Sequence, residues 1–499
     1  MKHANRTISL MLLLCMLAAS LAACGGDKPA VTTPQVTSSA PGEDVTTPAE
    51  TGEQLIVPMD KSYEGYKFVF LTTGHVAYND FDFYEDSAAS VVDNAQFQRK
   101  LKVEEMFDIT IEQQTAENKA SGSNPGYEKL RQAHTANEAM YDLMNIGGYC
   151  AAKSAVSNYL YDLNSTTYID TTKSWWDQNA NDDMTLNGVL FFTNGALSGA
   201  RSESTFVIFY NKTLGATKKL EAPYQLIRDK KWTLDTFASM CLEVSEELTG
   251  NDTRDPGDRY GLYCWDDAIV GMMAATGTRC VTIEDGAMTM TLYSDKSEEA
   301  FNKFTSIVYN KDYCLTYQRY SGQMNVVDSW CNDQALFWAT SNVNTAKMQE
   351  MNSDFSILPY PMLNETQGRY YTTIAPYNSQ FIAMPAIQED EERTSAIAET
   401  LAYEGKQILT PALYERTLKT NQVRDEDSAD MLDIIYDSYM YDLGYYFSIG
   451  NITTQLMNLI RNYDTGFASM WARIEKAANT QLDKYNKDLT TAAESWKTN

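Results

Sequence analysis

The chain has 499 residues, of which 43% are hydrophobic and 12% aromatic, so it is long enough to form two or more domains. Its formal net charge of −27 argues against nucleic acid as a partner, because phosphate contacts need clustered lysine and arginine. An acidic chain favours an uncharged or a cationic ligand instead.

The first 26 residues, MKHANRTISLMLLLCMLAASLAACGG, have the order of an export signal. Lys2 and Arg6 precede an apolar run from Ile8 to Ala19, and small residues follow it. The run is shorter than the roughly 20 apolar residues that span a bilayer. The closing LAAC resembles a bacterial lipobox, which implies cleavage before Cys24 and a diacylglycerol on its thiol. We therefore predict a lipoprotein signal peptide over residues 1–23; the alternative is an ordinary signal peptide with a chance cysteine.

Residues 24–54 are predicted to be the lipidated cysteine followed by a disordered tether. The segment VTTPQVTSSAPGEDVTTP is rich in Pro, Thr and Ser and lacks aromatic residues, so it cannot bury a core. No later apolar run is long enough to cross a membrane. The protein is thus expected on the outer face of the cell membrane, touching it only through the lipid anchor.

Strands and helices are predicted to alternate after the tether. Strand patterns cover residues 66–71, 108–112 and 141–146, and helical patterns cover residues 91–106 and 127–140. This alternation is typical of a parallel α/β sheet.

The middle and the end of the body mix both patterns. Strands are predicted at 205–210, 335–339 and 355–358, and helices at 297–309 and after Thr233, which is a good N-cap. The last third is mostly helical, with apolar stripes over the ranges 432–443 and 467–485.

No motif predicts catalysis, a cofactor or a metal. The chain has three histidines and no HExxH, GxSxG, GxGxxG or P-loop pattern. Its six cysteines after residue 24 lack CxxC spacing, and their pairing stays open. The loop NDTRDPGDRYG has Pro256 and Leu262 where an EF-hand needs glycine and glutamate. We predict that the protein is not an enzyme, although a glycoside hydrolase needs only two carboxylates.

Aromatic residues beside polar ones are candidates for carbohydrate contacts. Sugars present apolar faces for stacking and hydroxyls for hydrogen bonds. Ligands of open α/β sheets bind beyond the carboxyl ends of strands, and several candidates follow predicted strands. A single residue of this kind more commonly packs in the core than contacts a ligand. The candidates are Asp80, Asp82, Tyr84, Tyr149, Trp175, Trp176, Asp177, Trp265, Asp266 and Asp267.

Several stretches together resemble the extracellular solute-binding proteins of family 1, the sugar ABC transporter group that includes maltose-binding protein. They are VVDNAQFQRKLKVEEMFDITI, YDLMNIGG, FVIFYNKTLGA with WTLDTFASM, and DQALFWATS with DFSILPYPM. The resemblance implies an α/β, two-lobed periplasmic-binding-protein-like fold of type II, with lobes joined by crossing strands. When the lobe division of the family is applied to this sequence, lobe one is expected to hold residues 55–204 and 338–378. Lobe two is expected to hold residues 205–337 and 379–499.

The resemblance also implies positions for ligand contacts. Tyr149, Glu203, Trp265 and Asp266 fall where the family contacts sugar. Asn342 falls where the family often has tryptophan, so the usual stacking ring is in doubt. The residues expected to supply aromatic contacts instead are Trp338 or Trp330, and Tyr446 or Phe447.

These observations predict a lipid-anchored substrate-binding component of an ABC importer. It would capture a carbohydrate, most simply an oligosaccharide, by hinged lobe closure and deliver it to permease subunits. We expect a monomer. A same-fold binder of a peptide or another small solute and a surface glycoside hydrolase are the alternatives.

Overall fold

The first segments of the body build a four-stranded mixed sheet, with the strand order β11-β3-β1-β2 in the computed structural model. Its parallel strands are β1 (Tyr66–Gly74), β2 (Ile109–Glu117) and β3 (Leu143–Gly147). β11 (Gln380–Ala383) pairs antiparallel with β3. The chain runs from β1 outward to β2 and then back past β1 to β3. Because such crossovers are right-handed, the two connecting helices cover opposite faces of the sheet; they are α2 (Val91–Phe107) and α3 (Pro125–Ala136).

The structure describes residues 53–75, 77–83, 90–117, 125–341, 348, 351–420 and 426–497. Residues 53–499 form one compact unit. The predicted signal peptide and nearly all of the predicted tether, with Cys24, lie outside the described residues, as do Tyr84 and Asn342. Among the described helices, none combines the length and the apolar composition that crossing a membrane requires.

The second sheet has five strands in the order β10-β4-β9-β5-β8. β5 runs parallel to β8 and β9, whereas β4 is antiparallel to β9 and β10. The strands are β4 (Phe206–Asn211), β5 (Tyr260–Cys264), β8 (Cys314–Thr316), β9 (Ala335–Ser341) and β10 (Phe355–Leu358). A separate hairpin joins β6 (Val281–Glu284) and β7 (Ala287–Met290). The helices that pack on or near this sheet are α9 (Leu234–Val244), α10 (Ala268–Ala275) and α11 (Asp295–Val308).

Local sequence explains where these helices begin. α2 begins after Ser90, whose side chain accepts from the backbone N–H of Asp93, while the Asp93 carboxylate accepts from the Ser90 N–H. α9 begins after the predicted N-cap Thr233, whose hydroxyl accepts from the Thr236 N–H. The shorter helices are α4 (Gly148–Val156), α5 (Gln178–Met184), α6 (Ala200–Ser204), α7 (Lys212–Thr217), α8 (Pro223–Arg228) and α12 (Val326–Cys331).

Three extended segments connect the two sheets and are hydrogen-bonded to one another. They are residues 205–206, 372–375 and 438–442. Phe206 N–H donates to the Thr373 carbonyl at 3.0 Å, and Met440 N–H donates to the Thr372 carbonyl at 2.7 Å. The hydroxyls of Thr205 and Tyr439 lie 2.6 Å apart and tie the outer two segments together. The segments therefore form a narrow three-stranded connection between the sheets.

Strand pairing differs from the predicted division of the chain between lobes. β9 and β10 pair in the second sheet, although residues 338–378 were assigned with residues 55–204. β11 pairs in the first sheet, although residues 379–499 were assigned with residues 205–337. The physical reason is that sheet membership depends on which distant strand supplies the hydrogen-bond partner. Local sequence does not record that choice.

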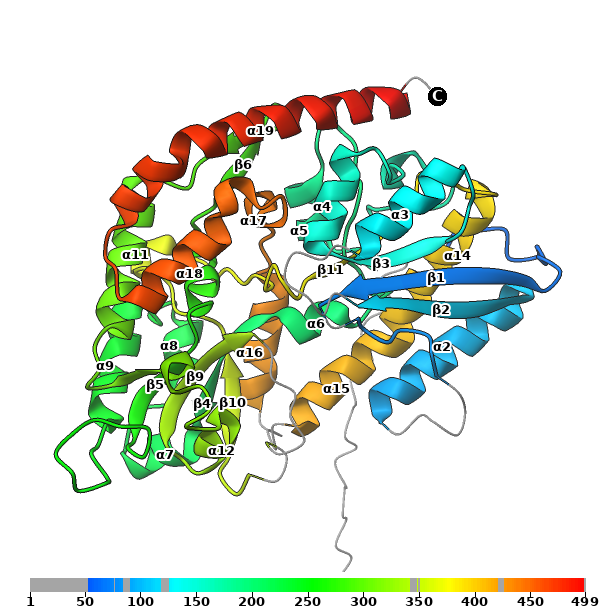
Figure 1. The fold of residues 1–499 in the computed structure, drawn as a ribbon. Coiled ribbons are helices and arrows are strands. Elements are labelled where there is room, and N and C mark those ends of the chain that lie inside the picture. Colours follow the sequence, from blue (N-terminus) through cyan, green and yellow to red (C-terminus); the bar gives the residue numbers. More distant parts are fainter. Residues whose placement is uncertain are drawn as a thin grey trace, which may run out of the picture. The chain divides into compact units, whose positions relative to one another are not determined.

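The C-terminal region is mostly helical, as predicted, but one of the two predicted stripes is interrupted. The apolar stripe 432–443 belongs to two elements, because α16 (Glu426–Asp437) ends before the crossing segment 438–442 and α17 (Leu443–Tyr446) follows it. The other helices of the region are α14 (Glu391–Glu404), α15 (Thr410–Thr420), α18 (Ile452–Asn462) and α19 (Phe467–Lys497). Figure 1 shows α19, which contains the predicted stripe 467–485, running from α11 to α4.

Aromatic and aliphatic side chains fill the core on both sides of the sheets. One continuous cluster extends from Phe68 and Phe70 of β1 to Trp471 of α19. A second cluster contains Phe209, Trp330 and Trp338 under the five-stranded sheet. The six cysteines after residue 24 are thiols in the structure, and five of them are buried.

Candidate functional site

Polar and aromatic residues gather at the carboxyl ends of the parallel strands in the second sheet. β5 ends at Cys264 and is followed by Trp265, Asp266 and Asp267, and β8 ends directly before Tyr317. The rings of Trp265 and Tyr317 lie 5.0 Å apart at an angle of 53°. We refer to Trp265, Asp266, Asp267, Tyr317 and Tyr377 as the strand-end cluster.

Tyr377 links this cluster to the first sheet. Its hydroxyl donates to the carboxylate of Asp267, the residue before α10. Two residues later, the Ser379 carbonyl accepts from Gly148 N–H at 3.0 Å, at the carboxyl end of β3. An added Cβ at position 148 would lie 2.3 Å from the Ser379 hydroxyl oxygen and 3.1 Å from the Tyr446 ring, so a larger residue there would displace these side chains. The segment 377–379 thus contacts the carboxyl ends of strands from both sheets.

The two aspartates of the cluster are buried and only partly paired. Asp266 is fully buried, and its Oδ2 accepts from Arg461 Nε of α18 at 2.9 Å. Burial raises the pKa of Asp267 to about 6, and the negative charge of Asp266 adds to the shift, while the Tyr377 hydrogen bond opposes it. The Oδ1 atoms of both aspartates have no hydrogen-bond partner among the described residues. Both Oδ1 atoms are shielded from solvent in this structure, and the half-buried rings of Trp265 and Tyr317 lie at the same strand ends.

Asp80, expected to contact ligand, is fully buried at the edge of the first sheet. Its carboxylate accepts from Ser198 Oγ at 2.8 Å and from Asn145 Nδ2 at 3.1 Å. Burial raises its pKa to about 6, opposed by the nearby Arg99. These bonds join the segment after β1 to strand β3 and to the segment before α6, so the structure assigns Asp80 to structural support. Asp82, two residues later, is exposed.

Three tryptophans expected at the ligand are buried in the protein core. Trp175 and Trp176 each expose 2% of their surface, and their indole N–H groups donate to the two carboxylate oxygens of Glu399 at 2.9 and 2.8 Å. Trp338 of β9 exposes 1% and packs on Phe209 with ring centroids 5.8 Å apart. When an aromatic residue stands next to a polar one, the sequence does not reveal which of the two faces the core. In these three cases the aromatic ring faces the core.

The remaining predicted residues lie on the first-sheet side or at the connection. Glu203 of α6 forms an ion pair with Arg416 of α15 at 2.6 Å. Tyr446 is buried against Phe381 of β11, with ring centroids 4.9 Å apart. Tyr149 is half-buried at the start of α4, and burial raises its pKa.

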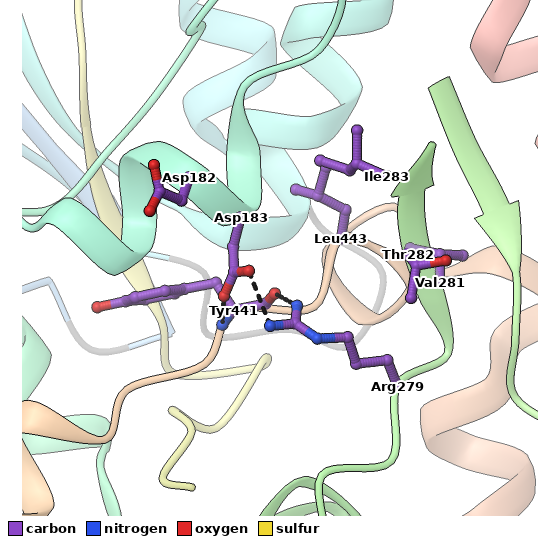
Figure 2. Close-up of a pocket in the computed structure, with 8 residues that line it drawn as sticks. All are labelled: Asp182, Asp183, Arg279, Val281, Thr282, Ile283, Tyr441 and Leu443. Atoms are coloured by element: carbon purple, nitrogen blue, oxygen red, sulfur yellow. Dashed lines mark hydrogen bonds and ion pairs between the residues drawn. The ribbon is translucent and has the colours of Figure 1, made fainter. Parts of the chain in front are cut away.

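A pocket of about 250 Å³ lies between α5 and the β6 strand (Figure 2). Its Arg279 pairs with Asp183 at 2.7 Å and donates to the Tyr441 carbonyl at 2.8 Å, while Tyr441 N–H donates to Asp183. The rest of the lining is Val281, Thr282, Ile283, Leu443 and the exposed Asp182. Arg279 and Asp183 of this pocket already bond to each other. We therefore interpret the pocket as a contact between secondary-structure elements and not as the ligand site.

Three residues at the site carried no sequence signal, namely Tyr317, Tyr377 and Arg461, and Tyr317 follows a strand, β8, that the sequence did not predict. Tyr377 lies 110 positions from Asp267, and Arg461 lies 195 positions from Asp266. Neither stands in a motif or at the end of a predicted strand. Within the described part of the chain, no group of three or more histidine, cysteine, aspartate or glutamate side chains is arranged to hold a metal ion.

No family model and no curated protein sequence matches the chain. Solved structures do resemble it. An ABC substrate-binding protein of Listeria monocytogenes in complex with cycloalternan superposes with a TM-score of 0.53 at 17% identity, covering 85% of this chain and 99% of that one. UgpB of Mycobacterium tuberculosis in complex with glycerophosphocholine gives 0.52 at 15% identity, covering 84% and 98%.

A family 1 extracellular solute-binding protein of Alicyclobacillus acidocaldarius gives a TM-score of 0.53 at 12% identity, covering 86% of this chain and all of that one. At sequence identities this low, the structural similarity establishes the fold of the chain. The two sheets, their crossing segments and these superpositions lead to one conclusion: the protein has the two-lobed α/β fold of the extracellular solute-binding proteins.

Proposed function

We propose that the protein is the solute-binding component of an ABC importer, that it captures a carbohydrate, and that it catalyses no reaction. The observation that carries the proposal is the two-lobed fold over about 85% of the chain. The strand-end cluster supports carbohydrate as the ligand, because it places the half-buried rings of Trp265 and Tyr317 at the carboxyl ends of β5 and β8.

The proposed mechanism is hinged closure about the three crossing segments. Ligand contacts made from both lobes stabilise the closed state, which the permease then recognises. The contact between Tyr377 and Asp267 supports this mechanism, because it joins the segment leading into the first sheet to the N-terminus of α10 in the second. No bond of the ligand is made or broken.

A same-fold alternative is a peptide or another small solute. UgpB, whose fold is similar, is seen with glycerophosphocholine, so the fold alone does not select sugars. A surface glycoside hydrolase is the alternative from a different class. Isothermal titration with a panel of oligosaccharides and short peptides separates the three. Binding of an oligosaccharide without release of shorter products supports the proposal. Steady release of shorter sugars supports the hydrolase. Heat from the peptides alone supports the same-fold peptide binder.

Replacing Trp265 by alanine is expected to weaken carbohydrate binding by about 1–3 kcal/mol, the range for loss of one stacking ring from a nucleic-acid site. Trp265 is half-buried in a tilted ring pair at a strand end. Tyr127→Ala is the matched control, since Tyr127 is also half-buried and forms a tilted pair, with Tyr159 at 5.6 Å, on α3. Equal affinities for Trp265→Ala and the unaltered protein would remove Trp265 from the site.

We also propose that Cys24 carries a lipid and anchors the protein on the outer face of the cell membrane. The sequence LAAC and the apolar run before it support this proposal. Cys24→Ser is expected to move the protein from the membrane fraction of expressing cells to the medium or the periplasm, as measured by fractionation and immunoblotting. Retention of the serine variant in the membrane fraction would contradict lipidation at this position.

A further inference from the structure

Asp266 joins the peptide that follows Trp265 to helix α18. Its carboxylate is fully buried, and Oδ2 accepts from Nε of Arg461 at 2.9 Å and also from Nη2 of the same guanidinium. Two N–H groups of one planar guanidinium that meet a carboxylate restrict its orientation as well as its distance. The Asp266 N–H donates to Gln318 Oε1 at 2.5 Å. The residue next to Trp265 is therefore held through both its side chain and its backbone.

Arg461 is itself held by its neighbours. Its Nη1 donates to Asn458 Oδ1, three positions earlier on α18, at 3.3 Å. Its carbonyl accepts from Arg319 at 2.7 Å, and the Arg319 guanidinium lies over the Tyr463 ring at 3.8 Å. Half of the Arg461 side chain is exposed, whereas the Asp266 carboxylate below it is not. The Arg461 guanidinium thus lies at the surface in a defined place.

The same hydrogen bonds determine how the two rings of the strand-end cluster meet. The half-buried Trp265 ring lies 5.0 Å from the Tyr317 ring. Asp266 directly follows the first ring, and Gln318 directly follows the second. The bond between the Asp266 N–H and Gln318 therefore links the ends of β5 and β8, and Arg461 fixes the orientation of the Asp266 side chain.

We infer that Arg461 is a positioning residue that holds the Trp265 ring against Tyr317 through the buried carboxylate of Asp266. Its effect on affinity rests on the proposed solute-binding function, whereas its effect on the ring does not require a ligand. A ring that is ordered before the solute arrives loses less conformational entropy on binding. Arg461 raises affinity in this way without contacting the solute.

Tryptophan fluorescence reports the Trp265 ring in the absence of ligand. The chain has eight tryptophans, of which Trp265 and Trp496 are half-buried. The other six are buried, namely Trp175, Trp176, Trp232, Trp330, Trp338 and Trp471. Trp496→Phe keeps a ring beside Tyr161 and removes the second half-buried indole. In this background, acrylamide quenching of the folded exported chain reports Trp265.

Arg461→Ala is expected to increase this quenching, because Asp266 loses its bonds to α18. Arg461→Lys is expected to give an intermediate value, since lysine keeps the charge but lacks the planar guanidinium. Arg473→Ala is the matched control, because Arg473 is exposed on α19 and donates to Gln455 of α18 at 2.9 Å. Equal quenching in Arg461→Ala and Arg473→Ala would overturn the inference.

A second variant keeps this test valid if Arg461→Ala does not fold. Removing Arg461 alone leaves the buried Asp266 carboxylate without its cation, which destabilises a protein. The double variant Asp266→Asn with Arg461→Ala removes the ion pair and leaves no buried charge behind. Its quenching is also expected to exceed that of Arg473→Ala. Quenching equal to that of the control, in a double variant with unaltered thermal unfolding, would overturn the inference.

Isothermal titration with maltotetraose and cellotetraose measures the consequence for binding. Arg461→Ala is expected to lower affinity by about three- to tenfold, the cost of ordering one side chain on binding. In a Trp265→Ala background the same change is expected to alter affinity by less than about twofold, because its effect passes through that ring. An equal loss of affinity in both backgrounds would contradict a role that acts through Trp265.

The two measurements separate failure of this inference from failure of the proposed function. Absence of heat with both sugars counts against carbohydrate as the ligand, and the quenching experiment still decides the role of Arg461. If a sugar binds and Arg461→Ala matches Arg473→Ala in both quenching and affinity, the positioning role is wrong and the proposed function stands.

Discussion

Replacing Arg99 by alanine is expected to lower the free energy of unfolding by about 3–5 kcal/mol, the cost of removing one member of a buried charged group. Arg99 is fully buried on α2 and lies over the Phe81 ring at 4.7 Å. It donates to the Leu197 and Asp80 carbonyls, and its charge stabilises the ionised form of Asp80. The alanine variant leaves both carbonyls without this donor, leaves the Asp80 carboxyl without its cation, and opens a cavity.

Urea unfolding followed by tryptophan fluorescence measures this effect. Arg131→Ala is the matched control, because Arg131 is exposed and pairs only with Glu128 on the same helix. That change is expected to cost about 0.5 kcal/mol or less. Equal losses in the two variants would contradict a supporting role for the buried guanidinium.

The folded protein is expected to become less stable as the pH rises from 5 to 8. Burial raises the pKa of Glu399 to about 7 and the pKa values of Asp80 and Asp267 to about 6. Each group binds its proton more tightly in the folded state than in the unfolded state. The stability that this contributes is fully present below the unfolded pKa near 4 and is lost as the pH rises through 6 to 7.

Of the three groups, Glu399 contributes most to this pH-dependent part of the unfolding free energy. Its shift corresponds to about 3 kcal/mol at roughly 1.4 kcal/mol per pKa unit. Glu399→Gln cannot take up that proton but keeps an oxygen that accepts from one of the two indole N–H groups. The difference in unfolding free energy between pH 5 and pH 8, measured in urea, is therefore expected to shrink by about 2–3 kcal/mol in this variant. A pH dependence equal to that of the unaltered protein would show that Glu399 does not titrate in this range.

Local periodicity and capping predicted β1 to β4, β9, β10 and several of the longer helices, whereas β5 to β8 and β11 were not predicted. The strand at 355–358 and the helix after Thr233 are confirmed, and the helix at 91–106 ends one residue later than predicted. These features depend on neighbouring residues only. The stripe 432–443 was misread as one helix because apolar spacing continues through residues 438–442. Those residues adopt an extended form since Thr372 and Thr373 supply hydrogen-bond partners from a distant part of the chain.

The candidate site was only partly predictable for the same reason. Trp265 and Asp266 were selected because they stand beside one another in a predicted loop, and the structure does put them at the end of β5. Tyr377 and Arg461 reach the cluster only through the tertiary fold. Trp175 and Trp176 have equally suggestive neighbours in sequence, yet Glu399, more than 220 positions away, draws their indoles into the core.

The length of α19 has a consequence for the proposed hinge motion. Near its start, Phe467 stacks on Phe301 of α11 with centroids 5.0 Å apart, and near its end, Trp496 lies against Tyr161 at 4.3 Å. α19 is one continuous helix of 31 residues and links these two contacts. In the proposed hinge motion, either α19 bends or one of these two aromatic contacts opens to water. The free energy of the two contacts then contributes to the balance between the open and closed states of the proposed mechanism.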